Sequence, residues 1–524
     1  MKVKKLIKKV WTTRFIFLSF ILILVFSQFM LQYQEDIWPK MYMLIALIAG
    51  ILVLLFADLN DPKAIARNTF VIIFFLGIAN ALIMPVRQNL DENTHYYFAL
   101  QLADGKARIQ TDEMNYLMVS PDFLAVTKMP SKPEYNNKEN TNLYTKQFLE
   151  LKSIPADYHH ESVSPGKFNN PAYLPSALGI KIGRIISNKL YISYYMGRIF
   201  NLVFYALLAY IAIKRSKIYK KQLFLLATIP YALWIPAGFS YDSLYYGLIL
   251  LVFSQLTNFL IADSKISGRQ LLCYEMTCLF LIFCKAPMIV LAALPLFIPK
   301  ENFAFKKVKL KIFCVGGGVA ILGGIWLVQE SILQALGKIA NNPSIQTLPN
   351  PNVERMSYFF EHPLYSLGVA LRSLSDIVTT IIMSIEEPQP YFIDTKTLNS
   401  INLFVFATLF VIILVAFQQK VSKSVKISLI VIITFVTFAV FYAISGDHRV
   451  FTIGDLHISG VQGRYHYYIL VALPLLLADR IQVGLNSLGV RIDTLDQERI
   501  TINLVNSMLL LNFLNTAIAV FGYL

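Results

Sequence analysis

Apolar residues in this chain come in long blocks that are separated by short polar segments. The blocks run for about 14–23 residues, and an α-helix needs about 20 residues to cross the hydrocarbon layer of a bilayer. The pattern therefore predicts an all-α polytopic membrane protein with about 13 transmembrane helices. The predicted spans cover residues 15–31, 41–57, 69–86, 190–213, 222–238, 241–261, two short spans within 271–299, 312–330, 401–418, 427–444, 466–479 and 503–522.

Composition and charge agree with this class of protein. Hydrophobic residues make up 56% of the 524 residues and charged residues only 15%, which is too little charge for the surface of a soluble protein of this size. The net charge of +15 comes largely from lysines and arginines in the short segments between predicted spans. That placement follows the positive-inside rule and argues against nucleic acid as a partner.

The distribution of these basic residues sets the predicted topology. Basic residues before the first span hold the N-terminus in the cytoplasm, so that two large loops lie on the extracytoplasmic side. All seven histidines fall in or beside the predicted outer loops, which favours chemistry on that side. The predicted divisions are a three-span segment at 1–86, a first outer loop at 87–172, a central membrane bundle at 173–330, a second outer loop at 331–400 and C-terminal spans at 401–524.

Two segments have a structure that hydropathy alone leaves open. Residues 271–299 have basic residues on both sides, so we expect a hairpin of two short spans with Lys285 at its outer turn rather than one long span. Residues 172–187 are amphipathic and carry Lys181 and Arg184, a pattern typical of a helix that lies in the membrane interface. The alternative for this second segment is the beginning of the next span.

The strongest sign of function is the sequence DENTH at residues 91–95. It stands where the third predicted span ends and the first large outer loop begins. Ionisable groups at such a boundary are costly, and they are usually retained for chemistry. We expect a short helix from this point to about Ala103, which places Asp91 and His95 one turn apart on one face.

These residues suggest distinct roles. Asp91 is a candidate general base toward an acceptor hydroxyl, and His95 either orients it or contacts the substrate. Glu92 assists Asp91 or holds a divalent cation, although two carboxylates and one imidazole are a thin ligand set and we expect no obligate metal ion. The structural alternative is that Asp91 only caps the helix.

Two basic residues are candidates for binding phosphate. Arg464 lies in the sequence QGRYH on the predicted outer side of a span, against the positive-inside trend, and an arginine can bind phosphate in a bidentate manner. Lys285 lies in the apolar hairpin, where it either meets the phosphate of a lipid carrier or extends its ammonium group to the surface.

Four more residues are candidates for lining a substrate cavity. Asp242 stands in the tight outer turn SYDS, where simple turn chemistry is the alternative role. Tyr96 either stacks on sugars or belongs to the aromatic packing that is general in membrane proteins. Gln462 and Tyr465 flank Arg464 in the QGRYH sequence.

Four blocks of sequence, taken in order, resemble a bacterial family of multi-spanning membrane proteins of unknown function. The similarity spans roughly residues 70–480, and the blocks are DENTHYYFALQLADGK, YMGRIFNLVFYALLAYIAIK, KAPMIVLAALPLFIP and QGRYHYYILVALPLLL. That family is similar to the GT-C superfamily of glycosyltransferases, which use polyprenyl-phosphate sugars on the outer membrane face. The resemblance implies Asp91 as the base with Glu92 beside it, and Lys285 and Arg464 facing the donor phosphate. The chain departs from GT-C enzymes in one respect, because its large acidic loop follows the third predicted span rather than the first.

These observations predict an inverting glycosyltransferase in a bacterial plasma membrane. Its partners would be a polyprenyl-phosphate-linked sugar, an acceptor glycan or glycolipid of the cell envelope, and the lipid bilayer. The alternatives are a polymerase or ligase of envelope polysaccharide, and a flippase or transporter of lipid-linked glycans. The predicted spans carry few charges, which disfavours the flippase. A polymerase would share the large outer loops.

Overall fold

The computed structural model describes residues 7–9, 11–30, 40–109, 116–129, 138–155, 157–163, 168–336, 351–386, 396–447, 449–488 and 495–522. The chain forms two compact units, each of which is described by itself below. Unit 1 comprises Met1–Ser254, Ile385–Phe417 and Arg480–Leu524, and unit 2 comprises Gln255–Ser384 and Gln418–Asp479.

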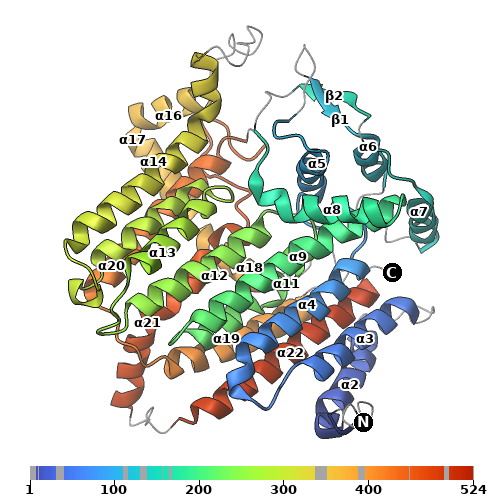
Figure 1. Ribbon diagram of the computed structural model, residues 1–524, viewed down its shortest axis with the longest axis horizontal. Coiled ribbons are helices and arrows are strands. Elements are labelled where there is room, and N and C mark those ends of the chain that lie inside the picture. The colour runs from blue at the N-terminus through green and yellow to red at the C-terminus, as the bar shows by residue number, and fades with distance from the viewer. Residues whose placement is uncertain are drawn as a thin grey trace. The chain divides into compact units, whose positions relative to one another are not determined.

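Long apolar helices make up most of unit 1 (Figure 1). The first described helix of the chain packs against the last, and α4 packs against both α3 and α9. Proline lacks a backbone N–H, and Pro230 and Pro236 accordingly break the predicted span 222–238 into three short helices. The helices of this part are α2 (Arg14–Met30), α3 (Lys40–Phe56), η1 (Pro62–Ala64), α4 (Ile65–Ile83), α9 (Leu190–Arg215), α10 (Lys220–Ala227), α11 (Pro230–Trp234), η4 (Ile235–Ala237), α12 (Asp242–Phe259), α19 (Lys396–Ala416) and α22 (Gln497–Gly522).

The first predicted outer loop folds into a polar subregion of unit 1 (Figure 1). The expected helix at the DENTH sequence is confirmed, since α5 ends at Ala103 and Gly105 follows with a φ of +76°. Two strands pair antiparallel, with Val119 opposite His159. The elements of this subregion are α5 (Glu92–Ala103), β1 (Tyr116–Val119), α6 (Pro121–Thr127), α7 (Lys138–Glu150), β2 (His159–Val163), η3 (Pro171–Tyr173) and α8 (Leu174–Ile186).

Helix α8 is the amphipathic helix that the sequence predicts. It ends at Ile186, before α9 begins, so the alternative that this segment starts the next span is wrong. Glycines let its buried face lie close to α9, because a Cβ at Gly179 would stand 2.3 Å from the carbonyl oxygen of Met196. Its other face leaves the side chains of Leu178 and Ile185 exposed.

Arg184 of α8 joins this helix to the other elements of the polar subregion. Its guanidinium forms ion pairs with Asp104 at 2.5 Å and with Asp122 at 2.9 Å, and it also donates to Ser153 Oγ. Burial alone would lower the pKa of Arg184, but the two carboxylates outweigh it and the pKa lies above its usual value. The charge of Arg184 therefore holds the loop together, which the amphipathic pattern did not reveal.

Unit 2 is built from α-helices and 3₁₀ segments, of which η5 is 12 residues long. The predicted break at Lys285 is present: one helix ends at Leu281, the next begins at Ala286, and the Tyr274 hydroxyl donates to the Leu291 carbonyl across the pair. That the two segments cross the membrane as short spans stays a prediction. The elements are α13 (Gly268–Leu281), η5 (Ala286–Phe297), η6 (Lys300–Asn302), α14 (Val308–Ala335), α16 (Pro351–Glu361), α17 (Pro363–Leu374), α18 (Asp376–Glu386), α20 (Lys423–Ile444), η7 (Gly463–His466) and α21 (Tyr467–Ser487).

The described residues support a multi-pass membrane protein. Among them, eight helices are long and apolar enough to cross a membrane, and three shorter helices are apolar. One of the eight, Pro363–Ile385, lies within the segment 331–400 that the sequence predicts as a loop. Hydropathy overlooked it because Arg372 and Asp376 stand near its middle, where α17 ends and α18 begins. The number of about 13 spans stays a prediction.

Candidate functional site

Asp91 occupies the position before the first residue of α5 but does not act as a cap. Its backbone is left-handed, with a φ of 53°, whereas a capping residue normally has an extended backbone. Its carboxylate makes no capping hydrogen bond to α5, and the residue is exposed. Left-handed conformations are uncommon outside glycine and cluster at functional sites. The alternative that Asp91 only caps the helix is therefore not supported.

Glu92 is held in a buried ion pair. Its two carboxylate oxygens accept from Arg198 of α9 at 2.8 and 2.7 Å, and both side chains are fully buried. The same carboxylate accepts from the backbone N–H groups of Asn89 and Phe239. These four donors hold Glu92 in place, so its geometry is that of a positioning residue. The predicted roles of helping Asp91 or holding a cation stay predictions.

Arg198 extends this network to the end of α4. Its guanidinium donates to the carbonyl oxygens of Ala81, Met84 and Pro85, at 3.0, 2.6 and 2.8 Å respectively. It also lies 4.8 Å from the ring centre of Tyr194. The end of α4, the start of α5 and the middle of α9 are thus fixed to one another next to Asp91 in the chain.

A second segment, residues 238–242, lies against the DENTH sequence. The Asn89 amide donates to the Trp234 and Ile235 carbonyls that precede it, and a Cβ at Gly238 would stand 2.3 Å from the Asn89 side chain. The next residue, Phe239, donates its backbone N–H to Glu92. The segment that ends in Asp242 is thus held beside Glu92, and the predicted cavity that it would share with Asp91 stays a prediction.

His95 lies one turn along α5 and contacts the same segment. Its Nδ1 is 2.7 Å from the Tyr173 hydroxyl, and its ring meets Tyr241 edge to face at 5.1 Å. Tyr241 adjoins Asp242, which begins α12, is fully buried and receives a hydrogen bond from Ser240 Oγ. His95 is therefore oriented by two tyrosines from different elements, which suits a residue that must present one ring nitrogen in a fixed direction.

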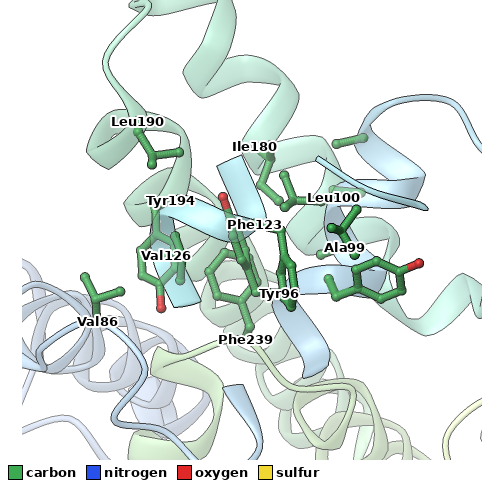
Figure 2. Close-up of a cluster of buried hydrophobic side chains, with 14 of the residues drawn as sticks. Val86, Tyr96, Ala99, Leu100, Phe123, Val126, Ile180, Leu190, Tyr194 and Phe239 are labelled. Atoms are coloured by element: carbon green, nitrogen blue, oxygen red, sulfur yellow. The ribbon is translucent and has the colours of Figure 1, made fainter. Parts of the chain in front are cut away.

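Tyr96 belongs to the core rather than to a surface. Figure 2 shows it among the side chains of Tyr194, Phe123 and Phe239. Its ring lies 5.0 Å from that of Tyr194 and 4.9 Å from that of Phe239, and it is fully buried. Burial raises the pKa of its hydroxyl well above the usual value. This packing favours the structural reading of Tyr96 over stacking on a sugar.

Unit 2 brings the two predicted phosphate-binding residues together. Lys285 stands at the break between α13 and η5, and Arg464 lies in η7. The Lys285 ammonium is 4.4 Å from the ring centre of Tyr465, and the Arg464 guanidinium is 5.4 Å from the same ring. Only 8% of Lys285 and 3% of Arg464 are exposed. We call Lys285, Gln462, Arg464, Tyr465 and His466 the cation cluster.

Close packing fixes the short turn that carries this cluster. A Cβ at Gly463 would stand 2.4 Å from the Thr380 carbonyl oxygen and 2.6 Å from the Ser384 nitrogen, so η7 lies directly on α18. The Gln462 side chain has a buried Oε1 with no hydrogen-bond partner among the described residues. His466 is fully buried. Glycine at position 463 is thus what lets η7 lie this close to α18.

The structure sorts the predicted site residues into two groups. Unit 1 holds Asp91, Glu92, His95, Tyr96 and Asp242, and unit 2 holds the cation cluster. No group of three or more histidine, cysteine, aspartate or glutamate side chains in the described ranges could hold a metal ion.

Sequence reasoning missed two residues of these groups. Arg198 is the only charged residue within the predicted span 190–213, which was a signal for a buried partner. His466 stood in the QGRYH sequence but was not selected as a site residue. His466 and His95 are both buried in the fold.

Comparison with known proteins agrees with the predicted family. A model for a family of predicted membrane proteins, DUF2142, matches residues 74–473. This range agrees with the span of roughly 70–480 over which the sequence blocks resemble such a family. Neither the curated proteins nor the solved structures gave a match to this chain. Because the model covers well over half of the sequence, the chain belongs to the DUF2142 family of predicted membrane proteins.

Proposed function

We propose that this protein is a membrane glycosyltransferase that moves a sugar from a polyprenyl-phosphate donor to a glycan or glycolipid of the cell envelope. The observation that carries the proposal is the cation cluster, in which Lys285 and Arg464 meet at the ring of Tyr465. These two residues come from distant parts of the sequence, and the sequence alone predicts phosphate binding for each of them.

An anion is a suitable ligand for two buried basic side chains that lie at one ring. Like charges repel more strongly in a low-dielectric interior than in water, and each loses hydration on burial. A phosphate group offsets both charges, and the guanidinium can bind it with two parallel hydrogen bonds. η7 leads directly into α21, and the two together form an apolar helix, Gly463–Ser487, that is long enough to cross a membrane. A phosphate on a long apolar chain suits such a location.

Asp91 supplies the second half of the proposed reaction. Its exposed carboxylate at the start of α5 accepts the proton of an acceptor hydroxyl. The acceptor oxygen forms a bond to the anomeric carbon of the sugar from the side opposite the phosphate. The bond from that carbon to the phosphate oxygen breaks, and its electron pair leaves with the phosphate. Lys285 and Arg464 offset the charge that grows there, and the configuration of the sugar inverts.

Glu92 and His95 position the base in this scheme. The Glu92–Arg198 pair fixes the backbone beside Asp91, and Tyr173 orients His95 on the same face of α5. The topology predicted from charge places the Asp91 segment, Lys285 and Arg464 on the same outer side of the membrane. The resemblance of the family to GT-C glycosyltransferases adds to the proposal as an analogy of sequence.

The rival functions predict different products. An envelope polysaccharide polymerase or ligase changes chain length or attachment, and a flippase leaves its lipid-linked precursor on the cytoplasmic side. A transferase instead removes one glycosyl substituent when it fails. These three outcomes can be distinguished by the composition of the glycan, the length of its chain and the location of the lipid-linked precursor.

The test is the composition of envelope glycans, measured by mass spectrometry in a deletion strain of the source organism. We expect the deletion to remove one glycosyl substituent, and Asp91→Asn and Arg464→Gln to fail to restore it at wild-type protein levels. Asn tolerates the left-handed backbone of position 91, so the Asp91→Asn substitution removes the charge without straining the turn. A full restoration by Asp91→Asn would remove Asp91 as the base.

Two control variants are matched to these changes. Asp61→Asn removes another aspartate at a helix start, where it accepts from the Lys63 backbone. Arg355→Gln removes another buried arginine of unit 2, which lies 4.8 Å from the ring centre of Tyr442. Both should restore the glycan. A changed chain length, or a precursor held inside the cell, would favour the polymerase or the flippase over the transferase.

A further inference from the structure

His466 has the properties of a residue that binds a ligand. It is fully buried, and neither of its ring nitrogens has a hydrogen-bond partner among the residues that the structure describes. Its ring neighbours are aromatic, with Phe441 and Tyr468 at centroid distances of 6.3 and 6.4 Å. Buried polar groups in proteins nearly always have a partner, so an imidazole with none needs an explanation.

The position of His466 in the fold indicates what the missing partner is. It belongs to the same short turn, η7, as Arg464. The Lys285 ammonium lies 4.4 Å from the ring centre of Tyr465, the residue between Arg464 and His466. Donors from a lysine, an arginine and a histidine are therefore gathered in one part of unit 2. An imidazole presents at least one N–H in either protonation state, so it can complete this set as a donor.

We propose that His466 donates a hydrogen bond to the phosphate group held by Lys285 and Arg464. This inference rests on the proposed function, and it extends it by adding a third donor to the phosphate site. The proposed ligand is a phosphate ester with a long apolar chain. Its headgroup and free phosphate both present a tetrahedral anion to these donors. Lys285 and Arg464 both lie near the ring of Tyr465, and His466 follows Tyr465 directly in the chain.

The test measures binding of a long-chain polyprenyl phosphate to the full-length protein in phosphatidylcholine nanodiscs. His466→Leu and His466→Phe remove the N–H donor, and His466→Gln keeps one. A hydrogen bond to a charged group is strong enough that its loss weakens binding by about 10- to 100-fold. We expect that loss for both Leu and Phe, and an affinity within about threefold of wild type for Gln. Thermal melting of each variant checks that it is folded.

Two further ligands identify what is bound. Polyprenol carries the same chain without the phosphate, and its binding should not respond to any substitution of His466. Inorganic phosphate should compete if the anion alone suffices for recognition. If it does not compete while polyprenyl phosphate binding still depends on His466, the lipid chain is required and the headgroup of a lipid is the ligand. Both results support the donor role of His466.

Other outcomes overturn the inference, and they separate it from the proposed function. If folded His466→Leu and His466→Phe bind polyprenyl phosphate as wild type does while Arg464→Gln does not, His466 is no donor but the phosphate site stands. If His466→Gln falls as far as His466→Leu, the ring shape matters and not the hydrogen bond. If wild type prefers polyprenyl phosphate over polyprenol by no measurable factor, both proposals fail.

Discussion

Replacing Arg198 tests whether Glu92 is a positioning residue. In Arg198→Met the Glu92 carboxylate keeps the backbone N–H groups of Asn89 and Phe239 but loses the guanidinium that pairs with it and two charge-assisted hydrogen bonds. Both side chains of the pair are fully buried, so solvent does not screen the change. Removing one partner of a buried ion pair costs about 3–5 kcal/mol. Three carbonyl oxygens at the end of α4 lose a donor as well.

The double variant Arg198→Met/Glu92→Leu separates charge from packing. It removes both charges, and a buried pair replaced by apolar residues is often close to neutral in stability. The carbonyl oxygens of α4 remain without the guanidinium, so we expect recovery of about half of the loss, roughly 2 kcal/mol. The four variants of the cycle then give a coupling free energy between the two side chains.

Unfolding by titration of denaturing detergent into mixed micelles measures these free energies. Arg449→Met is the matched control, because the Arg449–Asp447 pair is exposed and such pairs contribute about 0–1 kcal/mol. A loss below about 1 kcal/mol for Arg198→Met would refute the reasoning. The reasoning is refuted as well if the free-energy loss of the double variant equals the sum of the losses of the two single variants. Glu92 would then not be held by Arg198 and would be available for chemistry.

Three other substitutions test the packing around the site. Gly238→Ala should lower the free energy of unfolding by about 1–3 kcal/mol, because the new Cβ meets the hydrogen-bonded side chain of Asn89. Gly317→Ala, on the open side of α14, should be neutral or stabilising, and thermal melting compares the two variants. Arg184→Met should increase the rate of proteolysis in the polar subregion at least about tenfold, since two buried carboxylates lose their cation. An unchanged digestion pattern would contradict the role given to the ion pairs of Arg184 with Asp104 and Asp122. Glu275→Gln should change stability by less than about 1 kcal/mol, because neither oxygen of this buried carboxyl has a partner among the described residues; a melting temperature well below that of wild type would show that it has one.

Local patterns in the sequence predicted local structure well. The helix after Asp91 was readable from the order of residues, as was the break at Lys285, which basic residues on both sides required. Amphipathic periodicity identified α8 as a separate helix. In each case the determining interactions lie within the same stretch of chain.

Contacts between distant residues were beyond the reach of the same patterns. The charge of Arg198 within an apolar span signalled a partner, but only the fold shows that the partner is Glu92. Likewise, hydropathy marked α17 and α18 as loop because polar residues near their junction interrupt the apolar pattern. Lys285 and Arg464 were each selected for their own surroundings, and their meeting at Tyr465 depends on the packing of unit 2.

The most direct test of the proposed transferase is the amount of its donor in the membrane. A polyprenyl-monophosphate-linked sugar should accumulate when transfer stops, and mass spectrometry of membrane lipids measures it. We predict that a deletion strain complemented with Asp91→Asn accumulates this lipid to the level of the deletion itself, while wild type and Asp61→Asn keep it low. Equal donor levels in the Asp91→Asn and wild-type strains would contradict the proposal. So would accumulation of a diphosphate-linked oligosaccharide in place of the monophosphate-linked sugar.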